Sequence, residues 1–286
     1  MAVDITPQEQ AILDKVEIPP RPKALMTVND EAKKDEPSFP TIVHAIAEDV
    51  SISATVLKVV NSPAFRRPNP ISSIDQALNM LGIKRVLSIV NAVSVRGAIK
   101  TSVDLEDFWE YCSAVAHGCV LICKQLKMQA YADDAYTLGL FHAAGVPLLM
   151  SHFEDYAEFF TDANVCNWNQ MINQEMDKFH TTHTTIGALM AQDWSLPESI
   201  VDSIYNVHYA DGIFASGDLA EETLKLIALL KMARHFATLY QNPNAEDDEW
   251  SDLEGQVCEY LGVDDASIDE LQEEVLAGLA EEAESQ

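Results

Sequence analysis

The sequence is poor in basic residues. Its 286 residues include 18 Lys and Arg against 46 Asp and Glu, which gives a formal net charge of −28. Affinity for nucleic-acid phosphates and for anionic lipids comes from Lys and Arg, so this shortage argues against broad binding to either. No helical segment presents a basic face of the kind that nucleic-acid readers use. We therefore expect neither a nucleic-acid partner nor a membrane partner.

Long apolar runs are also scarce. The longest one, residues 139–150, contains His142 and is too short to span a bilayer. The first ten residues, MAVDITPQEQ, contain acids and no apolar run, which is not the pattern of a signal peptide. These two features predict a cytoplasmic protein.

Several catalytic and metal-binding motifs are missing. The sequence contains no GxSxG elbow, no P-loop, no GxGxxG after a strand and no HExxH. It also lacks the CxxC spacing of a cysteine-based zinc site. Cys112, Cys119 and Cys123 are seven and four residues apart, which places them on one face of a helix. We interpret them as small buried thiols in a reducing compartment.

The apolar residues that are present recur almost everywhere at the helical period. No segment shows the alternation and hairpin turns of paired strands, so the sequence predicts an all-α fold. Polar stretches divide the chain into an N-terminal helical lobe (1–100), a helical bundle (101–241) and a C-terminal extension (242–286). Within the bundle the pattern predicts helices over 105–127, 132–152, 167–192, 197–208 and 218–241.

The C-terminal extension carries most of the net charge. Residues 246–286 contain sixteen acids and no Lys, Arg or His. Ile268, Leu271, Val275 and Leu279 recur at spacings of three and four, while acids fill the other face. This pattern predicts an amphipathic helix packed on another part of the protein. The acids are then either a solvated face of a packed helix or part of a detachable, inhibitory or partner-binding helix.

Two stretches carry a recognisable order of motifs. Residues 18–95 contain IPPRP, IAEDVSISATVLKVVNSPAF and ISSIDQALNMLGIKRVLSIV. Residues 108–209 contain FWEYCSAVAHG, LGLFHAAGVPLL and EMDKFHTTHTTIGALMAQDWSLPESIVDSIYNVHY. Together they resemble the HDOD family, bacterial signalling proteins related to the HD and HD-GYP phosphohydrolases. The resemblance implies an N-terminal helical lobe packed on an HD-like bundle, and a regulatory or scaffolding role.

The resemblance also identifies a candidate site. Active HD enzymes bind metal through an early His, a His-Asp pair and a late Asp. Here Tyr111 falls near the early His, although an adjacent register remains open. His142 retains the His of the pair, and Ala143 stands where the Asp would be.

The remaining family positions also retain their histidines and lack an acidic residue. Arg234 falls near the late Asp, and His183 and His208 match two later histidines. Three histidines thus persist without the two anionic ligands, which leaves too little negative charge for an ordinary divalent metal site. We therefore expect no catalytic residue, no metal and no cofactor. His180 matches no family position and is expected at the surface or behind the site.

This site has two alternative interpretations. His142, His183, His208, Arg234 and Tyr111 could line a pocket for a small anion or a phosphorylated ligand. Alternatively, the cavity is filled and these groups are satisfied internally. The function predicted is a non-catalytic signal-transduction module that contacts other signalling proteins. The alternative is a metal-dependent phosphohydrolase acting on nucleotides or cyclic dinucleotides.

The N-terminal lobe offers a candidate partner contact. Asn61 and Ser62 end an aliphatic helix and are expected to bond backbone groups there. Phe65, Arg66 and Arg67 follow in a proline-flanked loop, where an aromatic beside two arginines suits an acidic partner. That partner could be this protein's own C-terminus or a second copy, which would give a homo-oligomer.

Overall fold

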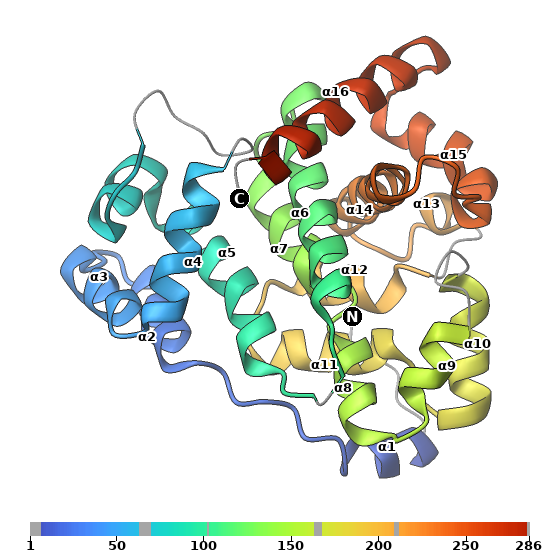
Figure 1. Ribbon diagram of the computed structural model, residues 1–286, viewed down its shortest axis with the longest axis horizontal. Helices are drawn as coiled ribbons and strands as arrows, with labels where there is room; N and C mark the ends of the chain where they lie inside the picture. The colour runs from blue at the N-terminus through green and yellow to red at the C-terminus, as the bar shows by residue number, and fades with distance from the viewer. Residues whose placement is uncertain (1–6, 63–69, 102, 163–167, 209–211, 285–286) are drawn as a thin grey trace.

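The computed structural model describes residues 7–62, 70–101, 103–162, 168–208 and 212–284. Every regular element in these ranges is a helix, which confirms the all-α prediction (Figure 1). The helices are α1 (Pro7–Leu13), α2 (Lys23–Ala32), α3 (Phe39–Ala47), α4 (Val50–Asn61), α5 (Ile74–Ala98), α6 (Glu106–Gln125), α7 (Ala132–Phe141), α8 (Gly145–His152), α9 (Tyr156–Asp162), α10 (Trp168–Phe179), α11 (His183–Asp193), α12 (Glu198–Asn206), α13 (Ile213–Ser216), α14 (Glu221–Gln241), α15 (Asp248–Leu261) and α16 (Asp265–Glu284).

Helices α2 to α5 form the N-terminal lobe, drawn in blue and teal in Figure 1. Side-chain caps fix where three of them begin: Ser38 Oγ accepts from Thr41 N, Asp49 from Ile52 N and Ser73 Oγ from Gln76 N. These bonds satisfy amide groups that have no partner within the helix.

Asn61 closes the end of α4 as the sequence predicts. Its Nδ2 donates to Leu57 O and Ile71 O, and its Oδ1 accepts from Ile71 N at 2.7 Å. Asn61 therefore joins the two ends of the 62–70 connection. Ser62 Oγ is buried without a hydrogen-bond partner among the described residues, so its expected backbone contact is not found there.

Helix α5 joins the lobe to the bundle and packs against α7. Two adjacent ion pairs cross this contact, Lys84 Nζ to Asp134 Oδ2 at 3.2 Å and Arg85 Nε to Asp133 Oδ1 at 2.6 Å. By length and composition α5 could cross a membrane, but half of its apolar window is buried inside the protein. Gly82, at φ 80° and ψ 166°, breaks its axis. Helix α5 therefore packs here as a core helix of the protein.

The bundle is built around α6, α7 and α14, which pack against one another. Cys112, Cys119 and Cys123 of α6 are all buried, as their spacing predicts. Burial raises the pKa of the Cys123 thiol to about 12, and it also raises the pKa of Cys112 and Cys119. These thiols are protonated packing groups at neutral pH.

Two of the predicted long helices are interrupted. The segment 132–152 forms α7 and α8, because residues 142–144 make a turn that brings α8 onto α11. The segment 167–192 forms α10 and α11, separated at His180, which has φ 59°. Thr182 then caps α11 by accepting from Thr185 N. Helix periodicity alone missed both breaks, and it also missed the short helices α9 and α13.

The C-terminal extension forms two helices, α15 and α16 (orange and red in Figure 1), and α16 is the amphipathic helix that the sequence predicts. Leu271, Val275 and Leu279 are buried where α16 packs on α6 and α14. Most of the acids whose side chains are described face solvent, whereas Glu249 and Glu282 are buried. The extension is therefore a packed part of the fold with two inward-facing carboxylates.

Candidate functional site

Three buried histidines come together inside the bundle. His142 directly follows α7, His183 begins α11, and His208 lies two residues beyond α12. The indole of Trp168, the first residue of α10, contacts all three. Its ring centroid lies 5.2 Å from that of His183 and 6.3 Å from that of His142, and it stacks on His208 at 5.6 Å with an interplanar angle of 6°. Trp168 therefore fills the space that the three imidazoles surround.

Hydrogen bonds set the proton positions on two of these rings. His142 Nδ1 lies 2.7 Å from Gly139 O, and a carbonyl can only accept, so Nδ1 carries the proton. His183 Nδ1 lies 2.9 Å from Glu175 Oε2, so it donates to that carboxylate. The Nε2 atoms of His142, His183 and His208 are all buried without a hydrogen-bond partner. They are spare nitrogens with no described group to bind.

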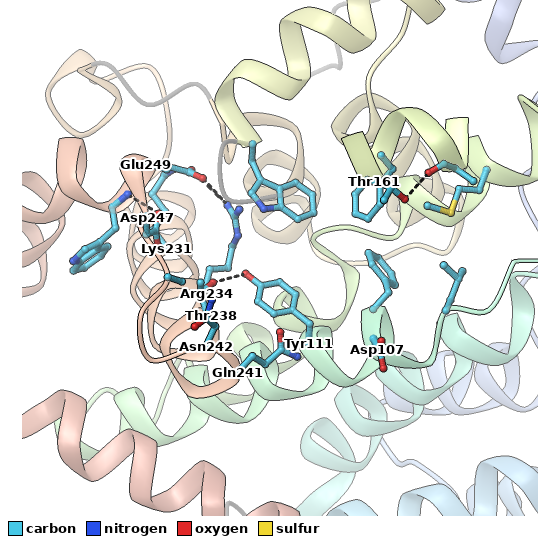
Figure 2. Close-up of a pocket in the computed structure, with 18 of the residues that line it drawn as sticks. Asp107, Tyr111, Thr161, Lys231, Arg234, Thr238, Gln241, Asn242, Asp247 and Glu249 are labelled. Atoms are coloured by element: carbon cyan, nitrogen blue, oxygen red, sulfur yellow. Dashed lines mark hydrogen bonds and ion pairs between the residues drawn. The ribbon is translucent and has the colours of Figure 1, made fainter. Parts of the chain in front are cut away.

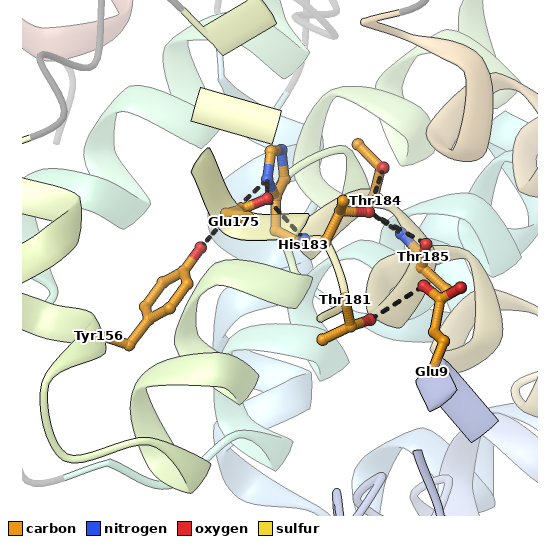
Figure 3. Close-up of polar contacts among 8 residues, drawn as sticks. Glu9, Tyr156, Glu175, Thr181, His183, Thr184 and Thr185 are labelled. Atoms are coloured by element: carbon orange, nitrogen blue, oxygen red, sulfur yellow. Dashed lines mark hydrogen bonds and ion pairs between the residues drawn. The ribbon is translucent and has the colours of Figure 1, made fainter. Parts of the chain in front are cut away.

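Glu175, on α10, accepts three hydrogen bonds from its neighbours. It accepts from the Tyr156 hydroxyl, from His183 Nδ1 and from the backbone N–H of His183 at 3.0 Å, as Figure 3 shows. The nearby Thr181 hydroxyl donates to Glu9, which ties α1 to this turn. Glu175 thus orients His183, and both of its oxygens already accept hydrogen bonds from neighbouring groups.

Arg234 also packs on the indole, with its guanidinium carbon 4.8 Å from the Trp168 ring centroid. Its Nη1 lies 3.3 Å from Glu249 Oε2, and the same carboxylate binds Lys231 Nζ at 2.7 Å. All three residues are buried. Glu249 comes from the C-terminal extension, so an acid of this chain already pairs with both cations (Figure 2).

Charges in this cluster follow from burial and from these pairs. Burial alone would raise the pKa of Glu249, but Arg234, Lys231 and His208 outweigh burial and hold that pKa well below the ordinary value. Burial, aided by Arg234, lowers the pKa of His142 to about 3. Burial also holds the pKa of His208 well below the ordinary value, although Glu249 opposes this. The part of the site around Arg234 therefore contains, at neutral pH, the cations Lys231 and Arg234, the carboxylate of Glu249 and the uncharged imidazoles of His142 and His208.

The residues present do not fit a metal ion. Within the described part of the chain, no three His, Cys, Asp or Glu side chains are placed to hold one. Ala143 contributes no ligand, Glu175 is committed to His183, and Glu249 is committed to Lys231 and Arg234. The guanidinium beside the histidines would also repel a divalent cation. The unpaired Nε2 atoms of the three histidines do not by themselves replace the missing anionic ligands.

A cavity of about 520 Å³ lies against this cluster. Its buried floor includes Trp168, Lys231, Arg234 and Glu249, and its exposed rim includes Asp107. Aromatic and aliphatic side chains form the walls: Leu105, Phe108, Tyr111, Met150, Phe160, Trp250 and Leu253. The volume is within the range of small-molecule sites, about 300–1,000 Å³.

The structure gathers most of the residues that the sequence singles out. His142, His183, His208 and Arg234 all surround Trp168. Tyr111 belongs to the same neighbourhood: its ring centroid is 6.4 Å from that of His142, and its hydroxyl lies 3.5 Å from Thr238 Oγ1.

Other predicted residues stand apart. His180 is exposed, in agreement with the surface position expected for it, and lies outside the cluster in the turn between α10 and α11. Phe65, Arg66 and Arg67 lie outside the described residues.

Sequence reasoning missed four members of the cluster: Trp168, Glu175, Lys231 and Glu249. Lys231 is three residues before Arg234 and therefore on the same face of α14, a spacing that could have indicated it. Glu249 is one of sixteen acids in its segment, so the sequence does not distinguish it from the others. Trp168 and Glu175 carry no local signal, because only the tertiary fold brings them to the histidines.

The comparisons with known proteins agree with this architecture. The sequence profile of the HDOD domain matches residues 18–210, which is more than half of the chain. The chain therefore belongs to the HDOD family. A crystal structure from Shewanella amazonensis SB2B, of a protein provisionally named a phosphohydrolase, is 25% identical with a TM-score of 0.69 and covers 96% of this chain and 98% of that one.

Two further relatives have no assigned function. An HDOD domain protein of unknown function from Geobacter sulfurreducens is 20% identical with a TM-score of 0.66 and covers 95% of each chain, which shows a shared fold. An uncharacterized protein from Treponema pallidum (strain Nichols) is 25% identical over 199 residues, 68% of this chain and 38% of that protein. The chain thus spans less than half the length of this curated relative.

Proposed function

We propose that this protein is a non-catalytic HDOD signalling module that acts by contacting other signalling proteins. The observation that carries the proposal is the guanidinium of Arg234 on the same indole that the three histidines contact, together with Ala143 in place of a carboxylate. An HD-type hydrolase needs anionic ligands to bind its metal and to leave a position for a water nucleophile. Arg234 supplies the opposite charge at this site.

We also propose that the degenerate site binds a small anion. Arg234 Nε is buried without a hydrogen-bond partner, and the guanidinium borders the cavity. A buried, unsatisfied donor on a permanent cation favours an anionic acceptor. The packing of Trp168 among the histidines supports the alternative that this inner part is filled, so the anion is assigned to the side of the cavity and not to the space between the imidazoles.

The alternative function is a metal-dependent phosphohydrolase acting on nucleotides or cyclic dinucleotides. The provisional name of the Shewanella relative is its main support. The discriminating feature of this chain is Ala143, because its methyl group cannot ligate a metal. Glu175 cannot replace the missing carboxylate while it holds His183 and Tyr156.

A direct assay tests the two functions. Purified protein is analysed for bound metals and then incubated with Mg²⁺, Mn²⁺ or Fe²⁺ and bis-p-nitrophenyl phosphate, a nucleoside triphosphate or a cyclic dinucleotide. We expect substoichiometric metal and no metal-dependent turnover. Any trace activity is checked in His142→Ala: a contaminant persists in that variant, whereas turnover by this site disappears. Stoichiometric metal with His142-dependent turnover would overturn the proposal.

We further propose that Phe65, Arg66 and Arg67 contact an acidic partner surface. The support is their chemistry, because two guanidinium groups beside an aromatic suit carboxylates. Deleting residues 246–286 is a poor test, since it would uncover the core that Leu271, Val275 and Leu279 cover. The double variant Arg66→Ala/Arg67→Ala is sharper: light scattering should show loss of self-association if the partner is a second copy, and an unchanged oligomeric state excludes that partner.

A further inference from the structure

The cavity beside Arg234 has two chemically different parts. Its walls offer the aromatic rings of Phe108, Tyr111 and Phe160, and at its floor lie Lys231 and Arg234. Apolar walls with a few converging polar groups are the usual arrangement of a small-molecule site. The walls would bind an apolar body, and the floor would bind a charged end.

The floor places two buried cations against one buried carboxylate. Lys231 and Arg234 are both buried cations, and the single carboxylate of Glu249 lies 2.7 Å from the first and 3.3 Å from the second. The other acid at this end, Asp247, pairs with His235 Nδ1 at 2.9 Å and caps α15 by accepting from Trp250 N. Asp247 also attracts both cations, but Glu249 is the carboxylate that pairs with them directly.

The rim limits the charge of a ligand. Asp104 and Asp107 are exposed on the cavity wall, and they would repel a ligand with several negative charges. Polyphosphates and nucleotides are therefore disfavoured. A ligand with one negative charge can place it on the floor while its apolar part shields it from the rim.

We propose that this cavity binds a small amphipathic monoanion, such as a medium-chain or aromatic carboxylate, whose anionic group competes with Glu249 for Arg234 and Lys231. The proposal rests on the anion-binding part of the proposed function and names its ligand class. Glu249 is the second residue of α15, and the cavity wall also includes Trp250 and Leu253 of that helix. Ligand binding is therefore coupled to the docking of the C-terminal extension, and the coupling is reciprocal.

Two matched fluorescent probes test the competition. 8-Anilinonaphthalene-1-sulfonate carries one negative charge on a fused aromatic body, and N-phenyl-1-naphthylamine has the same ring system without the charge. We expect the sulfonate to bind the wild-type protein with one-to-one stoichiometry. Glu249→Gln removes the competing charge and should tighten its binding at least tenfold, while binding of the uncharged probe stays within twofold.

Two further variants locate the effect. Asp252→Asn removes an exposed acid from the same helix and should leave the affinity of both probes unchanged. Arg234→Gln should weaken sulfonate binding at least tenfold, with circular dichroism checking that the variant is folded. Sulfonate binding that is unchanged or weaker in Glu249→Gln would overturn the proposal.

Hydrogen exchange on the wild-type protein gives a test that needs no variant. Saturating decanoate should speed amide exchange in α15, because the ligand releases Glu249, whereas pyrophosphate should have no effect. Unchanged or slower exchange in α15 with decanoate bound would overturn the coupling. The two proposals fail separately: absent probe binding together with absent hydrolysis rejects only the monoanion site, whereas metal-dependent turnover rejects the non-catalytic function itself.

Discussion

Glu249 and Lys231 form a buried ion pair, with Nζ 2.7 Å from Oε1, that joins the C-terminal extension to the helical bundle. Removing one partner of a buried pair leaves the other charge without compensation. Glu249→Gln should therefore lower the free energy of unfolding at pH 7 by about 3 kcal/mol. Chemical denaturation measures the loss, and the exposed-acid variant Glu254→Gln on the same helix should change stability by less than about 0.5 kcal/mol.

The same variant has a predictable pH dependence. The pKa of Glu249 in the folded protein is held well below its ordinary value of 4.5, so its stabilising contribution is present above pH 4.5 and is lost as the pH falls further. The glutamine variant has no such contribution to lose. The stability gap between the two proteins should thus narrow on acidification below pH 4.5, and a gap that widens there would contradict the assigned pairing.

Trp168 is predicted to hold the histidine cluster together by packing. It is 3% exposed and contacts three imidazoles and the Arg234 guanidinium. Trp168→Ala opens a cavity among these groups and should lower the free energy of unfolding by about 3–5 kcal/mol. Trp168→Phe retains part of the ring contact and should lose clearly less. If each variant lowers the free energy of unfolding by less than about 1 kcal/mol, the indole does not stabilise the cluster by packing as described.

His142 should make the protein sensitive to mild acid. Its pKa is about 3 in the folded state because of burial and Arg234, against an ordinary value of 6.5. Between these values the unfolded state binds a proton that the folded state does not, so stability falls as the pH falls below 6.5, by up to about 1.4 kcal/mol per pH unit. His142→Asn can still donate to Gly139 O but does not titrate, so its stability should fall less steeply between pH 6.5 and 3.5.

The matched control for this titration is His180→Asn, which changes an exposed histidine outside the cluster. Its unfolding free energy should follow the wild-type pH profile. An equally steep profile for His142→Asn would show that His142 is not the group responsible.

The sequence predicted the helical class, the packed amphipathic extension and the meeting of His142, His183 and His208, because periodicity and the family motifs report local structure and ancestry. It did not predict the breaks that create α8 and α11. Those breaks depend on how close two helices approach, as at Gly145 and His183, and helical periodicity carries no information on that distance. The sequence also could not select Glu249 from sixteen acids, because its burial depends on the tertiary fold and not on a local pattern.

The closeness of α8 and α11 makes Gly145 a sensitive position. A Cβ atom built there would lie 1.9 Å from the carbonyl oxygen of His183, so a larger residue must push the two backbones apart. Gly145→Ala should therefore lower the free energy of unfolding by about 3 kcal/mol, at the upper end of the usual cost of overpacking. The shift would also move His183 away from Glu175, because His183 bonds that carboxylate through both its backbone N–H and Nδ1.

A glycine in open surroundings provides the control for this effect. Gly255, in α15, has nothing within 4 Å of an added Cβ. Gly255→Ala should stabilise the protein by about 0.5–1 kcal/mol, because alanine restricts the unfolded chain and favours the helix. The two alanine substitutions are thus expected to have opposite signs in thermal or chemical unfolding. Two stabilising effects would mean that α8 and α11 do not approach as closely as the Gly145–His183 contact requires, and that His183 is not fixed in the cluster by this contact.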